Sequence, residues 1–378
     1  MKRVLILGGG FGGIATAVAL RAQLDPVDQI VLVDRRPSFV MGLRKNWALV
    51  GETSLAAGTR RLADLERGGI TVVQGSVTAI HPADRAADVD ARRLEADALV
   101  VALGAEHDAD RVPGFREFAI DAYDPDATAR GREAIERLTA GRVVIGIFGV
   151  PYPCPPGPFE LAMLLVSRFA RRRAAASVTV FSPLPLSLPM LGSAGCATVE
   201  SRLAGAGIEF LAARQPTAVV DGAVQFGDDR LNFDLLLGVP PHRPPAVVTE
   251  AGMTRGGAWI SVDRLTLETD FPGVYAIGDV TAIPLANGQL LPKAGVFAEA
   301  QGKVVAERVA AGFAGRVAAA RFSGEGACFF ELGAGTAVMI AGRFLADPPE
   351  ARLTEPGPEH LAAKRAFEAD RLRSWFGR

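Results

Sequence analysis

The stretch VLILGGGFGGIATAVALRAQLDPVDQIVLVD (residues 4–34) contains the pattern that decides the fold. Its first four residues form an apolar run typical of a buried strand, and they lead directly into GxGxxG at Gly8, Gly10 and Gly13. The first glycine permits a tight turn, the second lets the main chain approach a pyrophosphate, and the third lets a following helix pack on the strand. The pattern therefore predicts a strand and helix joined by a phosphate-binding turn.

A helix over residues 14–24 and a second strand over residues 30–33 complete this unit. The strand ends at Asp34, and an acidic residue about twenty positions after the glycines is where a dinucleotide's ribose is bound. The phosphates would lie at the helix N-terminus, where main-chain N–H groups are unpaired. The sequence thus predicts a bound dinucleotide, and Asp34 disfavours a 2′-phosphate.

The composition restricts the classes of protein to which the chain could belong. It has 378 residues, 49% of them hydrophobic, and a net charge of -1. This length is sufficient for two or three domains with buried cores, and the near-neutral charge argues against a nucleic-acid partner. The expected first strand begins almost at the first residue, so we expect no signal peptide and a cytoplasmic protein. Three cysteines fit free or redox-active thiols better than a secreted disulfide framework.

A second part of the dinucleotide site follows much later in the chain. The run ADALVVALG predicts a strand over residues 94–103 leading into Gly104, and TDFPGVYAIGD (residues 269–279) predicts a strand ending in Gly278 and Asp279. An acid at that place binds the ribityl hydroxyls of a flavin in two-domain flavoproteins. A helix expected to begin near Val296 would stabilise negative charge on a reduced flavin through its N-terminus.

The residues expected to contact the cofactor come from all of these segments. They are Gly8, Gly10, Phe11, Gly12, Gly13, Asp34, Arg35, Val77, Gly104, Gly278, Asp279, Lys293, Ala294 and Val296. The segment PSFVMGLRKNWALVG (residues 37–51) is expected to cover the adenine side or the mouth of the site as a loop. We expect Arg44 and Lys45 to be solvated there, with phosphate contact as the alternative.

A second cycle begins with an expected strand over residues 143–148, which is followed by GVPYPCPPGPFELAMLL (residues 149–165) where a second glycine fingerprint would stand. Five prolines in this loop remove N–H groups that a pyrophosphate would need, which disfavours NAD(P)H binding. The loop places Cys154 just before a helix expected to start near Pro158, and the helix dipole would stabilise a thiolate. A small buried core cysteine is the alternative, and the position at a strand's carboxyl end favours function.

The last sixty residues are expected to form a separate piece. Two strands joined by a glycine turn carry Cys328, and a helix over residues 361–375 has Lys364 among its polar positions. Leu372, Trp375 and Phe376 form the apolar end of this helix. We expect this end to dock on its own domain, while attachment to a membrane surface is the alternative.

Together these stretches resemble the sulfide:quinone oxidoreductases and the flavin subunit of flavocytochrome c sulfide dehydrogenase, a branch of the pyridine nucleotide-disulfide oxidoreductases. The resemblance spans nearly the whole chain and is carried by LILGGGFGG, VPYPCPPGPFE, DLLLGVPPHRPP, YAIGDV, PKAGVFAEAQGK, GACFFELG and KRAFEADRLRSWF. VPYPCPPGPFE is the most specific of them, since many other flavoproteins share the glycine motifs.

The resemblance implies an α/β fold with two Rossmann-like dinucleotide-binding domains, as in glutathione-reductase-like flavoproteins, and a small C-terminal α+β extension. The FAD-binding domain is expected over residues 1–105 and 256–318. The second domain, of the NAD type but without its fingerprint, is expected over residues 106–255, and the C-terminal strands and amphipathic helix over residues 319–378.

The resemblance also implies that Cys154 and Cys328 are a redox pair facing FAD. Sulfide, as HS⁻, would attack their disulfide and leave a persulfide on Cys328, while Cys154 would pass two electrons to the flavin and a quinone would reoxidise it. Residues 105–114 lack the additional cysteine that some members attach to the flavin, so we expect FAD to be held non-covalently. No metal site is expected, and the absence of a CxxCH motif excludes a c-type haem.

Two other functions remain open at this point. One is an NAD(P)H-dependent quinone or disulfide reductase that binds nicotinamide by unusual means. The other is a flavin-bearing persulfide carrier that loads sulfur for a partner without multiple turnovers. In each case the protein could be a homo-oligomer, and it could lie at the inner face of a membrane.

Overall fold

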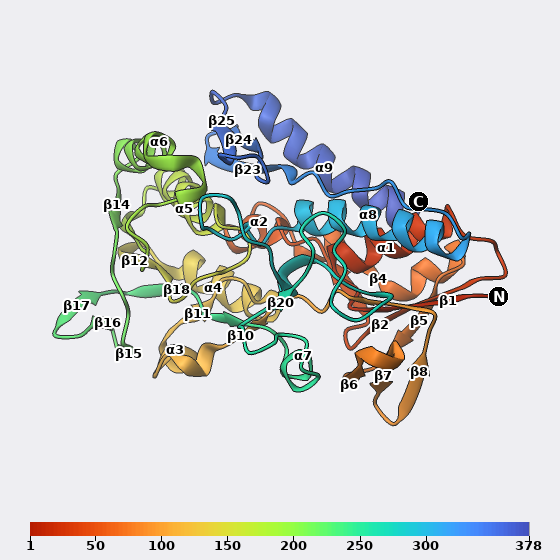
Figure 1. Cartoon of the computed structure of the whole chain (residues 1–378). Coiled ribbons are helices and arrows are strands. Elements are labelled where there is room, and N and C mark those ends of the chain that lie inside the picture. Colours follow the sequence, from red (N-terminus) through yellow and green to blue (C-terminus); the bar gives the residue numbers. More distant parts are fainter. Residues whose placement is uncertain (378) are drawn as a thin grey trace.

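The computed structural model describes residues 1–377 and contains two parallel five-stranded sheets that lie side by side (Figure 1). The first sheet has the order β21-β9-β1-β2-β5, and all its neighbours are parallel. Its strands are β1 (Arg3–Leu7), β2 (Gln29–Asp34), β5 (Thr71–Gln74), β9 (Ala98–Val101) and β21 (Val274–Ala276). The chain thus returns to this sheet after building the second one.

Both faces of the first sheet are covered, which explains the continuous apolar runs of its strands. On one face α1 (Phe11–Arg21) packs against α8 (Gly295–Phe313), so the segments expected to form the two halves of the cofactor site are adjacent. The other face carries α7 (Ala246–Glu250) and an antiparallel sheet of β6 (Val77–His81), β7 (Ala86–Val89) and β8 (Arg92–Glu95).

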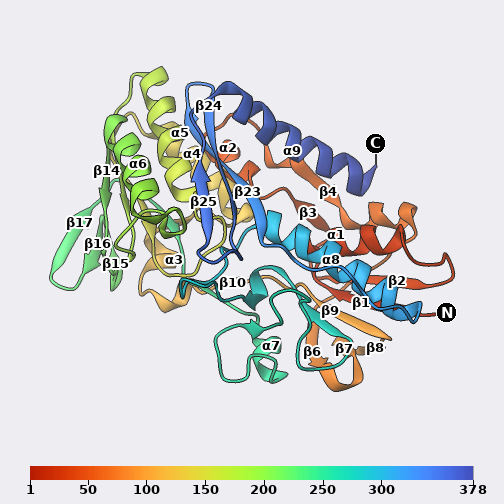
Figure 2. The same ribbon diagram turned by 45° about the horizontal axis from the view of Figure 1, so that its top comes forward.

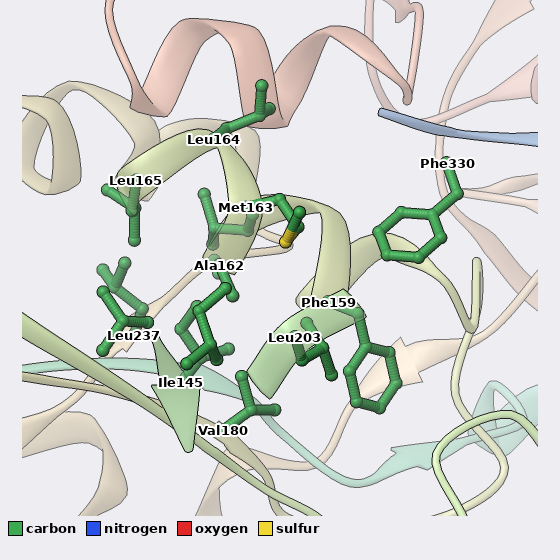
Figure 3. Packing of buried hydrophobic residues seen from close by; sticks show 14 of the residues in the cluster. Ile145, Phe159, Ala162, Met163, Leu164, Leu165, Val180, Leu203, Leu237 and Phe330 are labelled. Carbon is green, nitrogen blue, oxygen red and sulfur yellow. The ribbon is translucent and has the colours of Figure 1, made fainter. Parts of the chain in front are cut away.

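The second sheet has the order β11-β18-β12-β13-β14 and is also parallel throughout. Its strands are β11 (Ile120–Asp121), β12 (Ala140–Ile147), β13 (Ala175–Phe181), β14 (Ile208–Leu211) and β18 (Leu235–Val239). Side chains of α5 (Gly157–Arg172) and α6 (Gly192–Gly205) pack on one face, where Phe159, Met163 and Leu203 meet Ile145 and Val180 (Figure 3). The other face is covered by α3 (Phe115–Phe118) and by the strands β15 (Ala218–Val220), β16 (Ala223–Phe226) and β17 (Asp229–Asn232).

The C-terminal piece bridges the two halves of the molecule. An antiparallel sheet of β23 (Glu325–Gly333), β24 (Thr336–Arg343) and β25 (Glu350–Leu353) places β23 against both α5 and α8. From this sheet α9 (Pro358–Phe376) runs to α1 (Figures 1 and 2). Trp375 and Phe376 are buried there against Phe39, which confirms that this end of the helix docks on the chain's own domain.

Several expected elements differ in extent from the structure. The strand expected over residues 94–103 is split into β8 and β9, because Asp97 turns the chain and accepts the Arg3 N–H. The first helix begins at Phe11, within the glycine turn. Residues 44–49 form the helix α2 (Arg44–Leu49) rather than a loop.

The second half of the molecule also contains the helix α4 (Thr128–Arg137). The remaining strands are short: β3 (Ser38–Val40), β4 (Thr59–Arg61), β10 (Glu106–His107), β19 (His242–Arg243), β20 (Ile260–Ser261) and β22 (Thr281–Ala282).

Across residues 1–377, no helix is both long and apolar enough to cross a bilayer. The two sheets draw their strands from the segments that the sequence assigned to the two dinucleotide-type domains. The exact boundaries at residues 105, 255 and 318 stay a prediction.

Candidate functional site

The glycine turn after β1 can be built only from glycines at two of its positions. Gly8 has a φ of 110°, and a Cβ there would lie 2.3 Å from the Ala102 carbonyl oxygen. A Cβ on Gly13 would lie 1.8 Å from the carbonyl oxygen of Gly8. In front of Gly10, by contrast, the described part of the chain leaves open space to 4 Å. The main chain at Gly10 is therefore accessible to a ligand.

The start of α1 offers hydrogen-bond donors to an anion. Its N-cap is Gly10, no described side chain caps it, and its first turn contains no acidic residue. Such an uncapped N-terminus attracts a phosphate through its free N–H groups and its dipole. Asp34 stands beside the turn, where it accepts the Gly9 N–H at 2.7 Å and the Arg36 N–H at 2.8 Å. The glycine turn and the start of α1 thus fit the pyrophosphate of a dinucleotide, and Asp34 lies beside them where the ribose is expected.

The second half of the site lies where β21 ends. Gly278 has a φ of 72° and donates its N–H to the Gln301 side chain at 2.7 Å, while the Asp279 carboxylate has no hydrogen-bonding partner within residues 1–377. A cavity there is lined by residues that include Gly278, Asp279, Lys293, Ala294 and Gln301. Burial raises the pKa of Asp279 against the effect of Lys293. An unpaired carboxylate facing a cavity fits the hydroxyl groups of a ribityl chain.

Lys293 is buried, and its ammonium group donates to the carbonyls of Asp279 and Thr281. It also lies 3.5 Å from the centre of the Trp259 ring, a cation–π contact. Burial lowers the pKa of Lys293 to about 8, although the Asp279 charge acts in the opposite direction. Ala294 caps α8, and Val296 lies in its first turn with its side chain packed in the core. The N-terminus of α8 therefore faces the same cavity as Lys293.

The other residues expected to contact the cofactor differ in their surroundings. Gly12 packs closely on Ile277, and Gly104 has a φ of 69° with open space beside it. The Phe11 ring packs edge-on against Phe39 and Trp375, so its side chain serves packing at the start of α1. Arg35 is exposed and pairs with Glu106 at 3.5 Å. The Val77 side chain is partly buried and packs against the apolar cluster on the other face of the first sheet.

The open space at Gly10 makes a specific prediction. A Gly10→Ala substitution should weaken FAD binding at least about tenfold, equal to about 1.4 kcal/mol, because the new methyl group occupies the side from which the phosphates approach. The apoprotein should keep its stability to within about 0.5 kcal/mol, as surface substitutions usually do. Flavin titration and thermal unfolding of the apoprotein would measure the two effects. Gly205→Ala in α6, which also points into open space, is the matched control. Unchanged FAD affinity in Gly10→Ala would refute this assignment.

The loop between β12 and α5 holds Cys154 in a strained conformation. Cys154 has a φ of 51°, which costs a non-glycine residue about 1–3 kcal/mol. Its N–H donates to the Lys293 carbonyl at 2.7 Å, and its carbonyl accepts the Gly157 N–H at 2.8 Å and the Tyr123 hydroxyl at 2.9 Å. Contact with Lys293 brings the loop to the second half of the cofactor site. These bonds fix the main chain of Cys154 in the loop.

At the start of α5 the Gly157 N–H lowers the pKa of the Cys154 thiol, as expected, but this effect is outweighed. The side chain is solvent-accessible, but protein atoms surround it, and this burial raises the pKa of the thiol to about 11. Glu160 in the first turn of α5 acts in the same direction, whereas Lys45, Lys364 and the Gly157 N–H lower the pKa by less. A carboxylate at the helix start thus offsets the dipole.

Cys328 lies on β23 and faces the Cys154 loop. Pro155, Pro156 and Cys328 line one small apolar pocket together with Pro292 and Phe297. Burial, then the charge of Cys154, raises the pKa of the Cys328 thiol to about 12. The two thiols are free in this structure. The third cysteine, Cys196, is buried in α6 and donates to the Leu188 carbonyl at 3.0 Å, as a residue that serves packing does.

Comparison with known proteins identifies the family of this chain. The sequence pattern of the pyridine nucleotide-disulphide oxidoreductases matches residues 2–302. The chain belongs to this family. Within it, the chain is 26% identical to the sulfide-quinone reductase of Aquifex aeolicus over 341 residues, which cover 82% of this chain and 76% of the relative. It is 22% identical to the mitochondrial sulfide:quinone oxidoreductase of Mus musculus over 75% of this chain and 66% of the relative.

Another relative is an alternative NAD(P)H-ubiquinone oxidoreductase, C1, of Arabidopsis thaliana, which is 30% identical over 50% of this chain and 40% of its own length. The chain thus spans about two thirds of the mouse relative and less than half of the plant one. The X-ray structure of the Aquifex aeolicus sulfide:quinone oxidoreductase superposes with a TM-score of 0.88 at 22% identity, covering 100% of this chain and 92% of that one. The protein is an FAD-dependent oxidoreductase similar to the sulfide:quinone oxidoreductases.

A buried charge network next to Cys154 went unpredicted in this oxidoreductase. Lys364 of α9 donates to Glu160 at 2.8 Å and to Glu331 of β23 at 3.2 Å, and all three side chains are nearly inaccessible. Trp47 and Asn46 of α2 donate to Glu331 and Glu160 at 2.7 and 3.0 Å. The expectation that Lys364 occupies a polar position is therefore wrong. The burial of Lys364 could have been predicted from the sequence. Lys364 follows Leu361 by three residues and precedes Leu372 by eight, so it lies on the helix face that α9 buries.

The expectation that Arg44 and Lys45 lie in a solvated loop is also wrong. Arg44 is largely buried and forms a bidentate pair with Glu368 of α9. Lys45 is partly buried and donates to the Tyr123 carbonyl at 2.7 Å. Both side chains point into the protein because α2 packs on α4 and α5. Their partners lie too far away in sequence for a local pattern to indicate them.

Proposed function

We propose that the protein oxidises sulfide, or a related sulfur compound, through Cys154 and Cys328 and passes the electrons through FAD to a quinone. The observation that carries this proposal is the position of the Cys154 loop. This loop stands at the carboxyl end of β12, in place of a nucleotide fingerprint. The Cys154 N–H donates a hydrogen bond to the carbonyl of Lys293, a residue of the proposed flavin site. The same loop shares a pocket with Cys328.

The sulfur chemistry needs only these two side chains at first. HS⁻ would attack the sulfur of Cys328 in the Cys154–Cys328 disulfide, so that one S–S bond forms while another breaks. The products are a persulfide on Cys328 and a thiolate on Cys154, which leaves with the electron pair. FAD, when bound, supplies a two-electron acceptor that can pass electrons to a quinone. Gly8, Gly10, Gly13, Asp34 and Asp279 would hold it, without a covalent bond.

The second function with support is NAD(P)H-dependent quinone reduction, which the similarity to the plant NAD(P)H-ubiquinone oxidoreductase favours. The start of α5 speaks against it. Pro156 is its N-cap, Pro158 lies in its first turn, and the Glu160 carboxylate there would repel a pyrophosphate. A cytoplasmic location at the inner face of a membrane, and assembly into a homo-oligomer, stay predictions.

Turnover with a soluble quinone tests the proposal against the persulfide carrier. Holoenzyme given excess sulfide and quinone should reduce many equivalents of quinone per flavin. A second HS⁻ would remove the outer sulfur of the Cys328 persulfide as HS–S⁻ and leave two thiolates, and their two-electron oxidation by the flavin would restore the disulfide. Spectroscopic measurement of quinol and chemical measurement of sulfane sulfur would follow both products. Sulfur loading that stops near one equivalent per protein, with no further quinol, would contradict the proposal and favour the carrier.

A further inference from the structure

Lys45 lies in the surroundings of Cys154 and forms no ion pair with a carboxylate. Throughout residues 1–377, no carboxylate oxygen lies within 4.0 Å of its ammonium group. Lys364, the other cation that acts on Cys154, is held between Glu160 and Glu331, which compensate its charge. A partly buried ammonium that forms no direct ion pair is stabilised by a negative charge that forms nearby. The position of Lys45 identifies where that charge would be.

Tyr123 connects Lys45 to Cys154. The Lys45 ammonium donates to the Tyr123 carbonyl at 2.7 Å and lies 4.9 Å from the centre of its ring, while the Tyr123 hydroxyl donates to the Cys154 carbonyl at 2.9 Å. The neighbouring Asn46 donates to the Gly157 carbonyl at 3.0 Å, three residues after Cys154. Helix α2 and Tyr123 are therefore both bonded to the cysteine loop, and the Lys45 ammonium is held beside Tyr123 by its own hydrogen bond.

The charged and titratable groups around Cys154 differ in whether they favour its thiolate. The titratable groups that face it are Tyr152 and Glu160 from its own loop and helix, Tyr123 from the segment before α4, Cys328 from β23, Lys45 from α2 and Lys364 from α9. Lys45 itself is faced by Cys154, Asp121, Arg36, Asp124, His242 and Asp279. Burial lowers the pKa of Lys45, and Cys154 is the first of the charges that raise it again. Only the two lysines favour the thiolate among the side chains that act on Cys154.

We propose that Lys45 is a positioning residue that stabilises the thiolate of Cys154. Its part in turnover rests on the proposed function, because Cys154 is the sulfur that leaves when HS⁻ breaks the disulfide. A leaving thiol of lower pKa leaves faster, and the Lys45 ammonium adds to the effect of the Gly157 N–H at the start of α5, which Glu160 opposes. The thiolate itself can be measured without sulfide.

The pH dependence of Cys154 alkylation tests this proposal. Reduced holoenzyme would be treated with iodoacetamide over a range of pH, and mass spectrometry of the Cys154 peptide would give its rate. In Lys45→Met the apparent pKa should rise by about one unit, so that alkylation near neutral pH slows about tenfold. Lys45→Arg should restore most of the rate, because the guanidinium stays charged. Lys303→Met, at an exposed lysine of α8, should behave like the unsubstituted protein.

An alkylation profile in Lys45→Met that coincides with that of the unsubstituted protein would overturn the proposal, provided that the variant binds FAD and unfolds at the same temperature. If Lys45→Met does not fold, Lys45→Gln gives the same comparison with a polar side chain. The two hypotheses fail separately. A normal shift in the alkylation profile, together with an unsubstituted protein that sulfide does not reduce, would retain the role of Lys45 and refute the proposed function.

Discussion

Replacing Cys154 with serine is expected to slow anaerobic flavin reduction by sulfide at least about a thousandfold, in line with the loss of a reacting nucleophile in other enzymes. Serine cannot form the disulfide that sulfide attacks, and its hydroxyl is a far weaker acid than a thiol. Its side chain is similar in size, so the Cys154 main-chain bonds to Lys293, Gly157 and Tyr123 should persist. Stopped-flow absorbance of the oxidised flavin would measure the rate.

Cys196→Ser is the matched control for this experiment. Cys196 is buried outside the site, and a serine hydroxyl can donate to the Leu188 carbonyl as the thiol does. The control should reduce its flavin within about twofold of the normal rate, because a substitution that keeps its bonds has a small effect. Flavin reduction in Cys154→Ser as fast as in Cys196→Ser would refute the role of Cys154.

Replacing Lys364 with methionine is expected to destabilise the protein by about 3–5 kcal/mol, the usual effect of removing one partner from a buried ion pair. Glu160 and Glu331 would remain buried without their cation, and the link between α9, α5 and β23 would be lost. Burial lowers the pKa of Lys364, but the two carboxylates raise it further, so the ammonium is charged. Urea unfolding of the holoenzyme, followed by circular dichroism, would measure the change.

Arg343→Met provides the comparison for Lys364→Met. Arg343 pairs with Glu350 at 2.7 Å on the exposed side of the C-terminal sheet. An exposed pair contributes about 0–1 kcal/mol, so this variant should unfold almost normally. A Lys364→Met variant as stable as Arg343→Met would show that the buried network does not hold the C-terminal piece in place.

The parts of the fold that local sequence determines were predictable. The unit β1-α1-β2 depends on glycines that no other residue can replace at Gly8 and Gly13, and on apolar runs that only a parallel sheet buries on both faces. The proline loop around Cys154 was recognisable because prolines restrict the main chain wherever they stand. Both features are visible within about thirty residues of sequence.

The parts that depend on distant contacts were not predictable. Lys364 bonds to Glu160 across 204 positions, and α2 is held by contacts to α4, α5 and α9 rather than by a cap of its own. The raised pKa of Cys154 also depends on contacts that are distant in sequence. The sequence reveals Glu160 and the start of a helix, but the extent to which protein surrounds the thiol depends on the assembled fold.

The most direct test of the central claim is a comparison of two electron donors. Purified holoenzyme would be mixed anaerobically with sulfide and, separately, with NADH, and the visible absorbance of the oxidised flavin would be followed. The proposed function predicts that sulfide bleaches the flavin and that NADH does not. Rapid bleaching by NADH, with none by sulfide, would contradict it and would mean that the second domain binds nicotinamide despite its proline loop.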